Sequence, residues 1–89
     1  MIHQHKYRFF EDSGHGWLEV PRAEVEVSSA TITPYSYYNP STDMAYLEED
    51  CDMWNFLRAA GKGSASIGAT ISSAMLRWLP EYEATRGRV

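Results

Sequence analysis

The chain has 89 residues, which is enough for one small hydrophobic core and too few for a second domain. Hydrophobic residues make up 44% and charged residues 22%, an ordinary globular composition that excludes wholesale disorder. No stretch is long and apolar enough to span a bilayer, and the first residues lack the apolar run of a secretory signal. We therefore expect a single cytoplasmic domain over residues 1–89.

A β-hairpin is predicted near the start of the chain. Residues 6–10 are rich in aromatic side chains, and the turn signal at 12–16 contains two glycines, which tolerate a positive φ. Residues 17–20 form the return strand. It ends at Pro21, because proline has no N–H to donate to a ladder.

Residues 21–27 are compatible with two structures. Pro21 suits the first position of a helix, and Glu24 follows early in it. The alternation of Glu and Val over 24–27 fits an exposed strand equally well. Of the two, we favour one helical turn.

A second hairpin is predicted over residues 30–49. β-Branched and aromatic residues in 30–38 and 44–49 flank a turn cluster at 39–43. Pro34 would then have to lie at a sheet edge or a bulge.

Two helices are predicted after the second hairpin. The first covers 52–60, can be capped by Asp50 or Asp52, and ends at Gly61 in a left-handed conformation. Its apolar face consists of Met53, Phe56, Leu57 and Ala60. The second covers 70–79 and stops at Pro80. One of its faces carries Ile71, Ala74 or Met75, and Trp78 or Leu79.

The predicted fold is α+β, a small antiparallel sheet of two hairpins with the two helices packed on one face. We expect a loop or a weak strand at 61–69 and a frayed tail at 80–89.

The single cysteine, Cys51, cannot form an intramolecular disulfide, so the fold relies on packing alone. A core this small gives little stability, and proteins of this size often gain more by forming a homodimer or by binding a large partner. Four nearby carboxylates disfavour the thiolate, and we predict a structural, partly buried thiol rather than a nucleophile.

A metal-dependent enzyme is an alternative that the sequence supports weakly. His3, His5 and His15 share the first hairpin and could join Cys51, Asp50 or Asp52 in a metal site, but their spacing matches no compact metal motif. The carboxylates near Cys51 have no companion Ser, Lys or phosphate-cradling glycine loop. We therefore expect no cofactor, no metal and no enzymatic activity.

Charge is distributed unevenly along the chain. Ten of the 12 acidic residues precede Gly61, against four of the 8 basic ones. No basic stripe is present, which disfavours direct binding of nucleic acid. A nucleic-acid-binding or transcriptional accessory module, the other alternative, would have to use Arg77, Arg86 and Arg88. An acidic surface can instead meet a basic protein surface, or simply keep the chain soluble.

Aromatic residues exceed what so small a core can enclose, so some should lie on a surface that binds a partner. The other interpretation is that they are core residues with solvated hydroxyls. The predicted contacts with basic partner residues are Glu48, Glu49, Asp50 and Asp52. The predicted apolar anchors are Tyr35, Tyr37 and Tyr38.

Three blocks of sequence stand out together: GHGWLEVP at 14–21, ITPYSY at 32–37 and AYLEEDCD at 45–52. In this order they resemble a family of small proteins carried by phages, plasmids and other mobile elements of proteobacteria. The resemblance covers roughly residues 9–60. The chain departs from it between Pro21 and Ile32, where relatives carry a clearer leucine-bearing helix, and after Gly61.

The resemblance implies that the protein is carried by a mobile element, and this setting in turn implies a function. Short acidic proteins of mobile elements are often antagonists of host defence, and anti-CRISPR proteins are among them. It implies a non-enzymatic inhibitor in the host bacterial cytoplasm that binds a host protein complex, such as a CRISPR effector. An acidic, aromatic surface would block the basic groove in which that complex holds nucleic acid.

Overall fold

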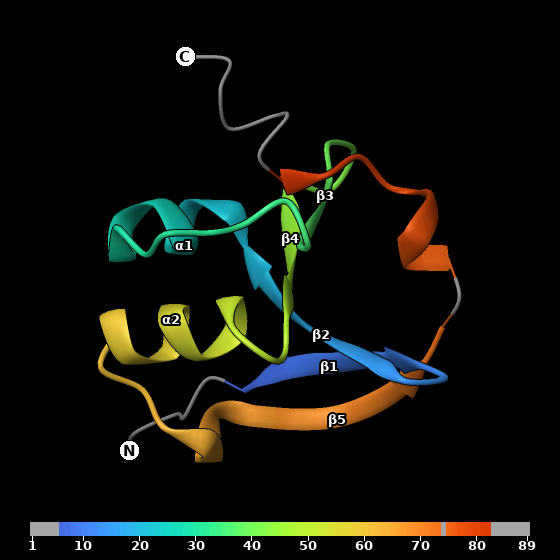
Figure 1. Ribbon diagram of the computed structural model, residues 1–89. Coiled ribbons are helices and arrows are strands. Elements are labelled where there is room, and N and C mark those ends of the chain that lie inside the picture. The colour runs from blue at the N-terminus through green and yellow to red at the C-terminus, as the bar shows by residue number, and fades with distance from the viewer. Residues whose placement is uncertain (1–5, 74, 83–89) are drawn as a thin grey trace.

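Five strands form one mixed sheet in the order β3-β4-β2-β1-β5, and two α-helices pack on one of its faces (Figure 1). The computed structural model describes residues 6–73 and 75–82. The strands are β1 (Tyr7–Asp12), β2 (His15–Pro21), β3 (Tyr37–Asn39), β4 (Met44–Glu48) and β5 (Ile67–Ser72). The helices are α1 (Arg22–Ser28) and α2 (Asp52–Ala59), with two short 3-10 helices, η1 (Ser64–Ser66) and η2 (Met75–Trp78). The α+β class is as predicted.

Both predicted hairpins are present. β1 pairs antiparallel with β2, and Gly14 in the turn has φ 95°, a conformation that glycine adopts without strain. β3 pairs antiparallel with β4, but β3 begins only at Tyr37. Pro34 lies in a turn before the strand, so it needs neither a sheet edge nor a bulge.

The prediction of a sheet built from two hairpins alone is wrong, because a fifth strand makes the sheet mixed. β5 pairs in parallel with β1, with Phe10 opposite Ile71 and Glu11 opposite Ser72. The helix predicted over 70–79 is absent. Its first residues belong to β5, and only the single 3-10 turn of η2 is helical. The β-branched residues Ile67, Thr70 and Ile71 suit a strand that can pair with the free edge of β1.

The two helices confirm part of the prediction. Residues 22–28 form α1 rather than a strand, and Ser29 ends it in the left-handed conformation at φ 61°. The apolar face predicted for the helix beginning at residue 52 is buried in α2. Its end is also as predicted: Gly61 has φ 71°, and its N–H donates to the Arg58 carbonyl while that of Lys62 donates to the Leu57 carbonyl.

The predicted caps of α2 are wrong. Cys51 occupies the N-cap position, and no side chain caps the helix there. Asp52 lies inside the first turn, where its carboxylate faces the core.

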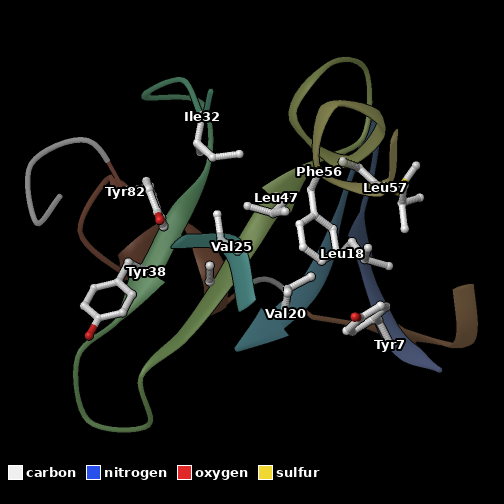
Figure 2. Close-up of a cluster of buried hydrophobic side chains, with 12 residues drawn as sticks. Tyr7, Leu18, Val20, Val25, Ile32, Tyr38, Leu47, Phe56, Leu57 and Tyr82 are labelled. Carbon is white, nitrogen blue, oxygen red and sulfur yellow. The ribbon is translucent and has the colours of Figure 1, made fainter. Parts of the chain in front are cut away.

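The main core lies between the helices and the sheet (Figure 2). Strands contribute alternate residues to it, and the helices contribute Val25, Met53, Phe56 and Leu57. Tyr82 is fully buried in the same cluster, so residues 80–82 are packed rather than frayed, contrary to the prediction. The rest of the predicted tail, 83–89, lies outside the described residues. None of the helices in the described part of the chain is long and apolar enough to cross a membrane.

Candidate functional site

A groove of about 400 Å³ lies on the sheet face opposite the helices. Its position follows from strand alternation: Leu18 and Leu47 point into the helix-covered core, so their neighbours Trp17 and Glu48 point to the other face. The lining residues come from β2, the 34–37 segment, the turn before α2, and the C-terminal part of the described chain: His15, Trp17, Pro34, Tyr35, Tyr37, Glu48, Asp50, Cys51, Arg77 and Glu81.

Aromatic rings form the apolar part of the groove. The buried ring of Trp17 lies with its centroid 5.7 Å from that of Tyr37 and 6.0 Å from that of His15, which stacks on it. The indole N–H of Trp17 donates to the carbonyl of Tyr35 at 3.3 Å, which fixes the indole. Tyr35 itself is 73% exposed, so most of its ring is accessible to a partner rather than buried in the core.

Arg77 is the cationic residue of the groove lining, and Asp12 compensates its charge. Arg77 Nε donates to Asp12 Oδ2 at 2.6 Å, and the guanidinium carbon lies 5.3 Å from the centroid of the Trp17 ring. The hydrogen bond raises the pKa of Arg77 and lowers the pKa of Asp12. The Trp17 ring thus already carries one cation within the chain.

The carboxylates of the groove divide into one that holds the backbone and two that face solvent. Glu48 accepts hydrogen bonds from the backbone N–H groups of Asp50 at 2.9 Å and Cys51 at 3.1 Å, so it shapes the turn before α2. Burial raises the pKa of Glu48. Asp50 and Glu81 are exposed at the groove. With Arg77 compensated by Asp12, the groove lining has an excess of negative charge.

Of the four predicted acidic contacts, the structure brings Glu48 and Asp50 to the groove. Glu49 is half-buried and does not line it. Asp52 is 0% exposed, and for this residue the prediction of a surface contact is wrong. Its Oδ2 accepts hydrogen bonds from the backbone N–H and the hydroxyl of Thr33 and from the hydroxyl of Ser36. Asp52 is therefore a structural residue that ties the 33–36 segment to α2.

Of the three predicted aromatic anchors, Tyr35 and Tyr37 line the groove. Tyr38 is buried on the helix side of the sheet and donates its hydroxyl hydrogen bond to Asp43, so its prediction as a surface anchor is wrong. Adjacent residues of a strand point to opposite faces, which separates Tyr37 from Tyr38.

Six lining residues were not predicted as contacts: His15, Trp17, Pro34, Cys51, Arg77 and Glu81. Arg77 was considered only for nucleic acid, and Glu81 fell in a predicted tail. Trp78, which follows Arg77, is 88% exposed, although the predicted helix placed it on a core face. Pro80 was the one local sequence signal for a break in regular structure near these residues. It does not predict that the segment around it packs beside the groove.

Cys51 is exposed, so the prediction of a partly buried thiol is wrong. It lies at the groove, and the side-chain amide of Asn55 approaches its sulfur at 3.5 Å. Within residues 6–73 and 75–82, no three His, Cys, Asp or Glu side chains are grouped as a metal ion would require. His3 and His5 lie outside the described residues. His15 is exposed and lines the groove.

No protein-family model, curated protein or solved structure matches this chain. The resemblance to proteins of mobile elements therefore stays a prediction, and the groove is interpreted from its own chemistry.

Proposed function

We propose that the protein is a non-enzymatic binding module whose groove takes up a basic side chain of a partner protein. One observation carries the proposal: the exposed carboxylates of Asp50 and Glu81 line the same aromatic groove as the exposed ring of Tyr35. A guanidinium or ammonium group gains from carboxylates and from an aromatic face together. Arg77 on Trp17 is the intramolecular version of that contact.

The charge of the groove also favours a basic protein over a nucleic acid. Carboxylates repel phosphate groups, and the lining cation Arg77 is already engaged by Asp12. The net charge of the chain, -4, adds a long-range attraction for basic surfaces.

The narrower hypothesis concerns the identity of the partner. A host defence complex, a CRISPR effector included, holds nucleic acid in a basic groove, and such a groove presents the arginine and lysine side chains that this site would take up. Inhibition would then follow from occupation of that groove in place of nucleic acid.

A binding experiment tests the proposal with a short acetylated arginine-rich peptide as the probe and intrinsic tryptophan fluorescence as the measurement, because Trp17 lies in the groove. We expect the double variant Asp50→Asn, Glu81→Gln to raise the Kd by about tenfold, since two surface ion pairs are lost. Equal affinity of this variant and the unmodified protein would contradict the proposal.

A second double variant controls for net charge. Val27→Lys, Thr42→Lys changes the total charge by the same amount at two exposed positions outside the groove. We expect it to weaken binding much less. Equal weakening by the two double variants would show a general charge effect and would remove the groove from the proposal.

A further inference from the structure

The two edge strands of the sheet, β3 and β5, differ in whether another segment of the described chain covers them. At the β3 edge, the N–H of Tyr38 donates to the Pro80 carbonyl at 2.9 Å, and the N–H of Tyr82 donates to the Ser36 carbonyl at 2.8 Å. Tyr37 also forms a β-bridge with Glu81. The C-terminal segment therefore covers this edge, which is a usual way to prevent pairing with another chain.

The β5 edge has no such cover among the described residues. β5 is the outermost strand and pairs on one side only, with β1 (Figure 1). Ala69, Thr70 and Ser72 are exposed. Proteins usually protect a free edge with charged residues or proline, and the stretch 63–76 contains neither.

The outward-facing backbone groups of β5 can be assigned from its last hydrogen bond. The N–H of Ser73 donates to the Glu11 carbonyl at 2.9 Å, so Ser73 points its backbone groups toward β1. Because backbone groups alternate in direction along a strand, the N–H and C=O groups of Ile71 also point toward β1. The N–H and C=O groups of Thr70 and Ser72 then point away from the sheet, toward a further strand.

Charge favours a second copy of this chain in that position. The net charge of -4 makes two copies repel each other in general, whereas the stretch 63–76 has no charged residue, so two β5 strands meet without like charges. An antiparallel arrangement also suits the ends of the strand. Lys6 lies at the beginning, where its ammonium donates to the Ala65 carbonyl, and the exposed Glu11 lies beside Ser72 at the end. A two-fold axis brings the basic end of one copy toward the acidic end of the other.

We propose that β5 is the interface of a homodimer in which the strands of two copies pair antiparallel across a two-fold axis. Each outward N–H of one strand then finds an outward C=O of the other, because the same surface is used twice. The sheet becomes continuous through both copies. No residue of β5 lines the groove, so the dimer leaves both grooves accessible and, if the proposed function holds, offers a partner two sites.

Sedimentation velocity over micromolar to millimolar protein tests the interface with Thr70→Lys, which places two like charges at the seam. We expect the unmodified protein to dimerise and the variant to raise the dimer Kd by at least about tenfold, since like charges in an interface are strongly unfavourable. Thr70 is exposed, so the substitution leaves the core intact, and near-ultraviolet circular dichroism checks this.

Two control variants make the test specific. Thr70→Val keeps the edge neutral and strand-forming, and Thr42→Lys places the same new charge in the exposed turn before β4. Both should dimerise as the unmodified protein does. A protein that stays monomeric at every concentration, a dimer unaffected by Thr70→Lys, or equal weakening by Thr42→Lys would each overturn the proposal. None of these outcomes bears on peptide binding by the groove.

Discussion

The two faces of the sheet are covered in different ways. On the helix face, α1 and α2 close over a continuous apolar cluster whose central members, Leu18, Leu47 and Phe56, have no exposed surface. On the other face, a smaller cluster of Trp17, Tyr46 and Leu76 is covered by the segment that contains η2. The first face resembles an ordinary core, and the second leaves room for a groove.

Two charged side chains are buried in the described part of the chain: Glu19 on the groove face and Asp52 in the first turn of α2. Glu19 lies in β2 with its carboxylate bound by Arg8 at 2.8 and 2.9 Å and by the Tyr46 hydroxyl at 2.8 Å. Desolvation and this bond raise the pKa of Tyr46. β2 is buried on both faces: Leu18 and Val20 meet the main apolar core, whereas on the other face the apolar Trp17 lies beside the ion-paired Glu19. The comparison indicates that stability comes mainly from the helix face, whereas the recognition that we propose uses the other face.

The largest effect is expected from truncating the helix-face core. Phe56→Ala removes a fully buried ring that packs edge-on against Tyr7, with centroids 5.7 Å apart. We expect a loss of about 3–5 kcal/mol in the free energy of unfolding, measured by urea denaturation. Leu76→Ala, in the smaller cluster, should cost less, about 2 kcal/mol, because the segment around it can relax.

Trp54→Ala is the control on the same helix. Trp54 is partly exposed and outside both clusters, so its removal should cost well under the loss for Phe56. A loss for Leu76→Ala as large as that for Phe56→Ala would contradict the division of roles between the two faces.

The next effect concerns the link between the faces. Asp52→Ala removes the acceptor for three donors of Thr33 and Ser36, of which the Ser36 hydroxyl is fully buried, and should cost about 3 kcal/mol. The same change should loosen the groove wall, because Pro34 and Tyr35 belong to the tethered segment. Urea denaturation measures the first effect and peptide binding the second.

Asp52→Asn separates hydrogen bonding from charge. One amide oxygen can still accept from the same three donors, so the loss of stability should be smaller than for alanine. Because asparagine places its NH2 group at the buried Oδ1 position, for which the described residues supply no hydrogen-bond partner, hydrogen exchange is the cleaner measurement: the Thr33 N–H should exchange faster in the alanine variant than in the asparagine variant, and equal exchange would contradict the acceptor role.

Local sequence signals were sufficient for most elements of the fold. Turn residues at 12–16 and 39–43 predict both hairpins, and the spacing of apolar residues after Asp52 predicts α2. They failed for β5. Ile71 and Leu79 happen to match a helical spacing, whereas the strand exists because β1 offers an edge far away along the chain. Such nonlocal pairing is not encoded in a window of neighbouring residues.

The candidate site was predicted less completely, for a related reason. Its composition, acidic and aromatic, was visible in Tyr35, Tyr37 and Asp50. Which neighbours face inward was not: Tyr38 and Asp52 follow surface residues closely but point into the core. Whether a side chain faces the core depends on the alternation along a strand or on the position around a helix. An error of one residue in a strand places every side chain on the wrong face.

The smallest expected effect is a pH-dependent loosening of the groove face alone. Arg77 lowers the pKa of Asp12 below its ordinary value of 3.8, so their pairing contributes stability that is present above that value. The contribution is lost as the pH falls through the lowered pKa, when Asp12 takes up a proton. Because Arg77 lies over Trp17, tryptophan fluorescence should change in this acidic range before the helix-face core unfolds. Asp12→Asn should abolish that early change while leaving the main acid transition in place, and an unaltered fluorescence titration in the variant would show that the pair does not hold the segment onto the sheet.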